Sequence, residues 1–164
     1  MNDHDPSCAF QSHDHEACTH DALSRAQEIC RESGARLTPV RKRVLEILLE
    51  EHRAMGAYDV LERLSAEGFG SQPPVAYRAL EFLVDQGFVH RIRRLNAFAA
   101  CSSPGSDHAP VFLICKACKA VAETPGQSVR EEVDRIANDL GFTVERSNIE
   151  ALGLCPTCAG EAAA

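Results

Sequence analysis

The chain has 164 residues, of which 45% are hydrophobic and 25% are charged. This length suits one domain or two small ones. No apolar run approaches the roughly 18 residues of a transmembrane helix, which argues against a membrane as partner. The start, Met-Asn-Asp-His-Asp, lacks the basic and apolar segments of a secretory signal. We therefore expect a cytoplasmic protein whose eight cysteines are reduced, because disulfide frameworks belong to secreted chains.

The net charge of −7 argues against nucleic acid as a partner until its distribution is considered. Residues 1–21 hold five acidic residues and no Lys or Arg, and residues 96–164 hold nine acidic and five basic residues. Residues 22–95 hold twelve basic and ten acidic residues. Any basic surface is therefore expected in the middle of the chain.

Two Cys-x-x-Cys pairs, Cys115 with Cys118 and Cys155 with Cys158, are the most specific pattern in the sequence. A two-residue spacing lets a tight turn direct both thiolates to one point. Two such turns supply the four ligands of a tetrahedral, closed structural zinc site. The alternative is two separate thiol sites, as in a redox enzyme, with accessible thiols of low pKa. The 36 residues between the pairs are expected to fold as a small subdomain.

Residues 1–21 show no periodicity and are expected to be a disordered tail. Four of the seven histidines and two of the eight cysteines of the chain lie there. These residues are either incidental or form an accessory zinc site that includes His15 and Cys18. Cys30, by contrast, falls on the apolar side of a predicted helix and is interpreted as a small buried residue.

Residues 22–100 carry the pattern of a winged helix-turn-helix domain. Thr38 is a good N-cap and Pro39 suits the first position of a helix. Helical periodicity is found at residues 23–32, 39–52, 57–67 and 74–86. Two short strands, 88–94 and 97–100, around a Leu95-Asn96 turn would form the wing. In such domains one helix enters the major groove of DNA and the wing contacts the backbone.

Residues 101–110 are polar and rich in Pro, Gly and Ser, which predicts a hinge. Residues 111–164 then read as two strands, a helix and another strand, at 111–115, 120–123, 127–140 and 142–154. The expected fold class is therefore α+β, with an N-terminal winged helix-turn-helix domain and a small α/β dimerisation domain that carries the four-cysteine zinc site. The second part is small for a stable core and would gain from dimerisation.

Three motifs together resemble the ferric uptake regulator family: Leu37-Thr38-Pro39-Val40-Arg41, Pro73-Pro74-Val75-Ala76-Tyr77-Arg78-Ala79-Leu80, and the two cysteine pairs. The resemblance covers residues 22–158. Within the family, the stretch Gln86-Gly87-Phe88-Val89-His90 followed by Cys101 is most similar to the zinc uptake regulator branch. The resemblance implies a homodimeric repressor in which metal bound at a hinge site favours the conformation that binds DNA.

The resemblance also implies two zinc ions per chain. The structural site falls on Cys115, Cys118, Cys155 and Cys158, and the regulatory site falls on His90, Cys101, His108 and Glu123. Imidazole, thiolate and carboxylate groups together suit tetrahedral zinc. Taken singly, His90 could instead face phosphate, His108 could be a solvated loop residue and Glu123 an exposed strand end. The stretch Asp107-His108-Ala109-Pro110 lacks the extra histidines of the iron and peroxide branches, which argues against those branches.

Double-stranded DNA is the partner that the resemblance implies. Arg78 is expected at a base edge, because a guanidinium group can fork onto guanine, with Tyr77 and Tyr58 nearby. Phosphate contacts are expected from the basic residues Arg41, Lys42, Arg91, Arg93 and Arg94, each of which could equally be a solvated side chain. The order Val75-Ala76-Tyr77 departs from the Thr-Val-Tyr order that is commoner in the family, so base contacts there would differ.

We therefore predict a zinc-dependent transcriptional repressor of zinc uptake genes that acts through a palindromic operator. An enzyme is not expected, nor a small organic substrate, because the sequence has no serine nucleophile elbow, phosphate-binding loop or nucleotide fingerprint. One alternative is an iron-responsive or peroxide-sensing repressor of the same family. The other is a zinc buffer or chaperone that binds metal but not DNA.

Overall fold

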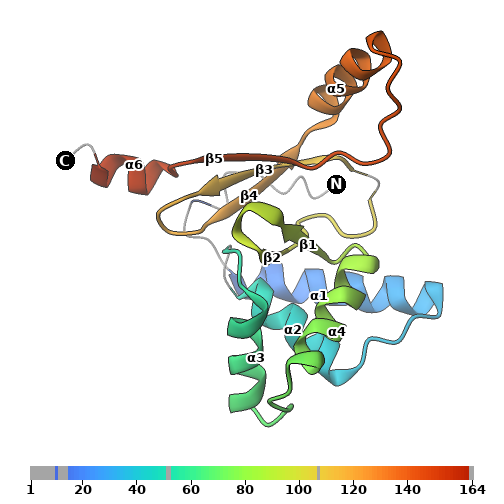
Figure 1. The fold of residues 1–164 in the computed structure, drawn as a ribbon. Coiled ribbons are helices and arrows are strands. Elements are labelled where there is room, and N and C mark those ends of the chain that lie inside the picture. Colours follow the sequence, from blue (N-terminus) through green and yellow to red (C-terminus); the bar gives the residue numbers. More distant parts are fainter. Residues whose placement is uncertain (1–9, 11–14, 51–52, 107, 163–164) are drawn as a thin grey trace.

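The computed structural model describes residues 10, 15–50, 53–106 and 108–162. The chain forms a group of four helices with a β-hairpin, followed by a small three-stranded sheet with two further helices (Figure 1). The hairpin lies between the helices and the sheet, and so forms the junction between the two parts of the molecule (Figure 1). Among the helices of the described residues, none is long and apolar enough to cross a membrane.

The four N-terminal helices are α1 (His15–Ser33), α2 (Pro39–Leu49), α3 (Ala57–Ala66) and α4 (Pro73–Asp85). The last three confirm the periodicity of the sequence. The predicted first helix was too short: α1 begins at His15, not at Leu23, so part of the expected tail is helical. Thr19 in this stretch donates to the carbonyl of Leu49 at the end of α2, at 3.5 Å. A tertiary contact of this kind leaves no apolar period in the sequence.

Local sequence explains where α2 starts. Thr38 has an extended backbone and its hydroxyl accepts a hydrogen bond from the N–H of Arg41, and Pro39 occupies the first helical position. Both features satisfy or remove donors that the first turn of a helix leaves unpaired. The apolar side of the helix, Val44, Leu45, Ile47 and Leu48, is buried in the main core.

The main core lies between the N-terminal helices and the inner side of the hairpin. Its buried members include Cys30 from α1, Ile47 from α2, Leu64 from α3 and Leu80 from α4. Burial raises the pKa of the Cys30 thiol, as expected for a thiol that serves as a small apolar residue. The interpretation of Cys30 is thus confirmed.

Truncation of Leu80 should lower the free energy of unfolding by about 2–5 kcal/mol. The side chain of Leu80 is fully buried, so Leu80→Ala removes apolar contacts and leaves a cavity. Chemical denaturation would measure the change, with the exposed neighbour substituted in Glu81→Ala as the control, which should stay within about 0.5 kcal/mol of the wild type. Equal effects of the two substitutions would contradict this position of the core.

The wing is the antiparallel hairpin of β1 (Val89–Ile92) and β2 (Ala97–Ala100), with Val89 opposite Ala100. The predicted first strand, 88–94, was too long. Residues Arg93–Leu95 form a 3₁₀ turn, η2, and Asn96 closes it with a positive φ of 47°. Asparagine tolerates this left-handed conformation better than most residues, which explains the compact turn.

The C-terminal part contains β3 (Pro110–Cys115), β4 (Val121–Pro125), α5 (Gln127–Asp139), β5 (Ile149–Gly153) and α6 (Pro156–Ala162). The sheet order is β4-β3-β5, with β4 antiparallel and β5 parallel to β3. The predicted order of elements is confirmed, but the last strand was expected from residue 142. Only residues 149–153 pair with β3, because the residues before them form the connection from α5. The short helix α6 was not predicted.

Apolar packing and backbone pairing both join the helical part to the sheet. Ile92 of the wing packs with Phe112, Ile114 and Val121 of the sheet in a second buried cluster. Residues just before α3 form a strap: Met55 pairs with Phe98 of β2, and the N–H of Ala54 donates to the carbonyl of Lys119 beside the first cysteine pair. The wing is therefore held directly against the C-terminal part.

Candidate metal centres and nucleic-acid interface

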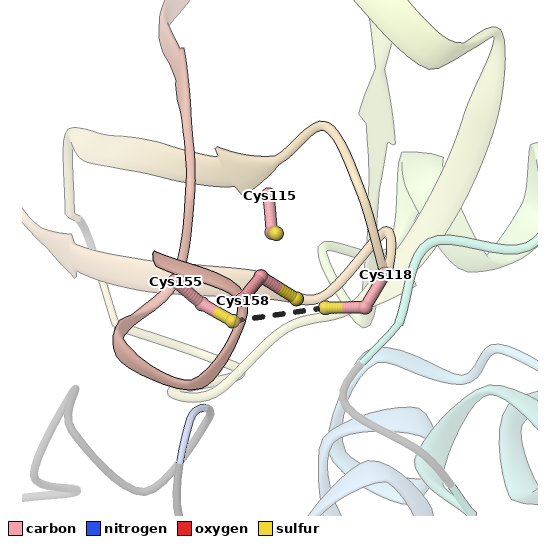
Figure 2. A group of neighbouring side chains, drawn as sticks. All are labelled: Cys115, Cys118, Cys155 and Cys158. Atoms are coloured by element: carbon pink, nitrogen blue, oxygen red, sulfur yellow. Dashed lines mark hydrogen bonds between the residues drawn. The ribbon is translucent and has the colours of Figure 1, made fainter. Parts of the chain in front are cut away.

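The four paired cysteines converge on one point (Figure 2). Cys115 ends β3 and Cys118 follows in the next turn, while Cys155 follows β5 and Cys158 lies in α6. The turn of the first pair closes at Lys119, which has a φ of 64°. All four sulfur atoms lie within 4.8 Å of one another. The topology therefore brings together two pairs that are far apart in the sequence, as predicted.

The spacing of these sulfur atoms fits zinc. A tetrahedral ion with Zn–S bonds of about 2.3 Å places its sulfur ligands about 3.8 Å apart. The Sγ atoms of Cys118 and Cys155 are 3.8 Å apart. Cys115 and Cys155 are buried, with Phe10 packed beside them. This donor set of four soft ligands, with no place left for a substrate, suits a closed structural site.

The backbone favours negative charge in this cluster. Hydrogen bonds from the backbone N–H groups of Cys118 and Cys155 lower the pKa of Cys115 to about 6. The neighbouring Cys155 side chain and burial raise the pKa of Cys158 to about 12. Close sulfur atoms cannot all ionise without a cation among them. A divalent ion would hold all four as thiolates, because metal ligation displaces the thiol protons.

The second cluster brings together His90, Cys101, His108 and Glu123. His90 comes from β1, Cys101 follows β2, His108 precedes β3, and Glu123 lies in β4. The Sγ of Cys101 lies 3.6 Å from Nε2 of His108, and Oε1 of Glu123 lies 3.2 Å from Nε2 of His90. The four residues that the resemblance implies are thus neighbours in space.

The hydrogen bond that His108 makes through Nδ1 leaves its Nε2 atom available to a cation. Its Nδ1 lies 2.9 Å from the carbonyl oxygen of Ser106. A carbonyl oxygen only accepts, so Nδ1 donates there and Nε2 is the nitrogen that could bind a cation. This Nε2 faces Oε1 of Glu123 at 2.6 Å. Two acceptor atoms in such close contact need a second ring proton or a metal ion to bridge them.

The protonation of Cys101 and Glu123 also reflects the cluster. Burial, together with the adjacent Glu123 carboxylate, raises the pKa of Cys101 to about 12. Burial tends to raise the pKa of Glu123, but the hydrogen bond and charge of His90 outweigh this effect. The N–H of Ser102 also donates to Oε2 at 2.8 Å, and the pKa of Glu123 falls to about 2. A buried carboxylate that stays ionised attracts cations.

These distances fit zinc with a small adjustment. Bond lengths of about 2.0–2.3 Å in a tetrahedron place sulfur about 3.6 Å from nitrogen, and nitrogen about 3.3 Å from oxygen. The Cys101–His108 and His90–Glu123 distances agree with these values. The His108–Glu123 pair, at 2.6 Å, would open slightly. An ion bound here would tie the wing, the 101–110 segment and the sheet together.

Two of the predicted DNA-contacting residues, Tyr58 and Tyr77, are exposed and lie side by side. Tyr58 begins α3 and Tyr77 lies in α4, with side chains 67% and 41% exposed and ring centroids 6.4 Å apart. Both line a cleft of about 360 Å³ that also includes Arg91 and Asn96 of the wing. Arg78 is exposed, and its side chain makes no hydrogen bond or ion pair to any residue that the structure describes.

The basic residues predicted to contact phosphate differ in how free they are. The guanidinium of Arg41 lies 3.6 Å above the ring centroid of Phe82 and donates to the carbonyl of Arg36. Lys42 pairs with Glu46 at 3.7 Å, and Arg91 donates to Oδ1 of Asn96. Arg93 and Arg94 are exposed at the wing turn. Contact with DNA remains a prediction for all five residues.

Sequence reasoning missed three supporting residues. Ser106 accepts from the ring of His108, Ser102 donates its backbone N–H to Glu123, and Glu150 accepts from the wing turn. A serine-rich hinge beside a predicted ligand was the only signal for the first two. The accessory site in the tail lies outside the described residues: α1 includes His15 and Cys18, but their side chains are not described.

A winged helix joined to a cysteine-clipped sheet through a second four-ligand cluster defines a metal-dependent DNA-binding regulator. The sequence profile of the Ferric uptake regulator family matches residues 32–152. The chain belongs to this family.

Two curated relatives illustrate its position there. The zinc uptake regulation protein of Escherichia coli (strain K12) is 36% identical over 141 residues, which are 85% of this chain and 82% of the relative. The peroxide operon regulator of Bacillus subtilis (strain 168) is 26% identical over 136 residues, 83% of this chain and 92% of the relative. The greater similarity is thus to the zinc-regulating protein.

Comparison with solved structures also gives high similarity to zinc uptake regulators. A zinc uptake regulator complexed with zinc and DNA matches with a TM-score of 0.84 at 35% identity, over 89% of this chain and 98% of that chain. Holo XcZur matches with a TM-score of 0.77, over 85% and 98% of the two chains. Apo XcZur, also 35% identical, matches with a TM-score of only 0.51, over 87% and 99%. The present structure is therefore more similar to the holo than to the apo form.

Proposed function

We propose that this chain is a zinc-responsive transcriptional repressor that binds DNA as a homodimer, with zinc as its co-repressor. Its operator would be palindromic and would lie at genes for zinc uptake. The observation that carries the proposal is the cluster of His90, Cys101, His108 and Glu123. One candidate ligand atom from each residue lies within 4.8 Å of the others, although the residues come from both parts of the molecule. Cytoplasmic location follows from this role.

The chain would hold two zinc ions with different roles. The four-cysteine ion would fasten β5 and α6 to the β3–β4 turn, and so maintain the sheet. The ion in the second cluster would fix the helical part relative to the sheet. With residues 101–110 as the hinge, zinc that binds this arrangement better than an open one shifts the population toward it. The higher similarity to the holo structure supports this reading.

Exposed apolar side chains support a homodimer. Ile136, Leu140 and Phe142, at the end of α5 and just after it, are 49–79% exposed, and Leu113 and Leu152 are exposed on the sheet. Within the described part of the chain these side chains stay exposed, and exposed apolar surface of this kind marks interfaces. Two wings related by a two-fold axis would match two half-sites of a palindromic operator.

Replacement of Arg78 by Ala should weaken binding to the preferred operator by about 1–3 kcal/mol and relax the preference at one base position. Binding to a panel of single-base operator variants would measure both effects. Arg130→Ala, which removes the same charge from exposed α5, is the control and should leave the preference unchanged. Equal weakening by Arg78→Ala on every sequence would show a phosphate contact instead of base reading.

Metal identity separates this proposal from its alternatives. An iron-responsive or peroxide-sensing repressor would bind the operator with Fe²⁺ or lose binding on peroxide treatment, at free zinc too low to fill the second cluster. A zinc buffer or chaperone would bind zinc without any affinity for DNA. The softness of the Cys101 thiolate favours zinc over iron at this site.

Selection from random double-stranded DNA tests the function without knowledge of the operator. With zinc-loaded protein, we expect enrichment of an inverted repeat whose half-sites are spaced by whole turns of the helix. No enrichment with zinc, iron or manganese would overturn the repressor proposal. Enrichment with iron alone would leave a repressor but assign it to another branch.

A further inference from the structure

The wing turn is held by one carboxylate from the opposite part of the molecule. Glu150 of β5 accepts the backbone N–H of Arg93 on Oε1 at 2.7 Å and that of Arg94 on Oε2 at 2.9 Å. These are the first donors of the η2 turn, which no residue within a short helix can satisfy. A carboxylate that takes one such donor on each oxygen makes strong, charge-assisted hydrogen bonds.

The surroundings fix this carboxylate in place. Asn148 donates its side-chain amide to Oε1 of Glu150 at 2.7 Å, and Glu150 lies opposite Phe112 where β5 pairs with β3. Burial tends to raise the pKa of Glu150, but the hydrogen bonds from Arg94, Asn148 and Arg93 outweigh it and hold the pKa below its usual range. The group is therefore ionised when it binds the turn.

The same turn is anchored on its other side by packing. Leu95 contacts the buried cluster of Ile92, Phe112, Ile114 and Val121, and Asn96 closes the turn with its positive φ. The backbone of η2 is thus fixed to the sheet at two points. The Arg93 and Arg94 side chains, in contrast, are exposed.

We infer that Glu150 is a positioning residue for DNA binding: its carboxylate holds the η2 turn against β5 so that Arg93 and Arg94 face the phosphate backbone in one fixed orientation. The inference rests on the proposed function, because it assigns the wing turn to DNA.

The inference makes a prediction with an unexpected sign. Glu150 is an anion close to the arginines that would face DNA. Because its negative charge repels phosphate, its charge alone predicts that removal of this charge strengthens DNA binding. The positioning role predicts the opposite result, weaker DNA binding. Glu150→Gln retains the shape but places an amide NH₂ opposite one of the two backbone donors. We expect it to weaken binding of zinc-loaded protein to the selected operator about tenfold.

The matched control is Glu145→Gln. Glu145 is exposed in the connection before β5 and has no partner among the residues that the structure describes. The control removes the same charge five residues earlier in the chain and should leave affinity equal or slightly higher. Zinc content should stay the same in both variants, because neither residue belongs to a metal cluster.

Two further readouts distinguish positioning from a general loss of structure. Amide hydrogen exchange at residues 93 and 94, in zinc-loaded protein without DNA, should become at least about fivefold faster in Glu150→Gln and stay unchanged in Glu145→Gln. In an Arg93→Gln/Arg94→Gln background, Glu150→Gln should have no further effect on DNA affinity, because the groups that it positions are gone.

Unchanged exchange in Glu150→Gln would overturn the hydrogen-bonded turn itself. Faster exchange with equal or tighter DNA binding would overturn the positioning role, as would a full tenfold loss in the background without the two arginines. If the wild type does not bind DNA with zinc, the proposed function and the DNA part of this inference both fail, while the exchange measurement still decides whether Glu150 holds the turn.

Discussion

Replacement of Cys155 by Ser should remove the structural zinc and unfold the sheet. Cys155 is buried with Cys115 and Ala120 in a cluster that has few other apolar contacts. Structural zinc contributes about 10–16 kcal/mol in small zinc-finger peptides, which is comparable to or larger than the whole stability of a typical domain. A serine hydroxyl is a poor ligand for zinc, and three thiolates would remain close together without a full set of ligands.

Zinc content, circular dichroism and sedimentation of Cys155→Ser would measure this effect. We expect loss of the tightly held zinc, loss of sheet structure and loss of the dimer. Cys30→Ala is the matched control, because Cys30 is a buried cysteine outside both metal clusters; it should keep the zinc and the dimer. A folded, dimeric Cys155→Ser protein with its full zinc content would contradict the structural role.

Replacement of Cys101 by Ser should abolish the zinc response and leave the fold intact. Cys101 supplies the only sulfur of the second cluster and lies where β2 meets the hinge. Without its thiolate the site has three hard or borderline ligands and a lower zinc affinity. The variant should retain one tightly held zinc but lose the gain in DNA affinity on zinc addition, which we expect to be at least about tenfold in the wild type.

Ser102→Ala is the control for this prediction. Ser102 reaches Glu123 through its backbone N–H, so removal of its hydroxyl leaves that hydrogen bond in place. Operator binding titrated against free zinc should be the same for Ser102→Ala as for the wild type. If Cys101→Ser responded to zinc like the wild type, the second cluster would not be the regulatory site.

The sequence predicted best those features that depend on short-range spacing. Periodic apolar residues predicted α2, α3 and α4, and the two-residue spacing of Cys115 and Cys118 predicted a turn that aims both at one ion. The ends of the helices and strands were predicted less accurately. The stretch of α1 that was not predicted contains Thr19, which contacts the end of α2, and the length of β5 depends on where β3 offers it partners.

The second cluster could be predicted only from the family resemblance. His90 and Glu123 are 33 residues apart, and no spacing rule joins a strand residue in a wing to one in a separate sheet. The contact of Glu150 with the wing turn could not be predicted from the sequence. A single glutamate in a predicted strand gives no sign of a hydrogen bond to a turn 56 residues earlier. Such contacts arise from the packing of the two parts.

The most direct test of the account is the zinc dependence of DNA binding, measured together with zinc stoichiometry, on the wild-type protein. As free zinc rises, bound zinc per chain should increase from one to two, and affinity for the selected operator should rise at least about tenfold over the same range. DNA binding that is already complete with one zinc per chain, or that does not change when the second ion binds, would contradict the central claim that zinc in the His90, Cys101, His108 and Glu123 cluster controls this repressor.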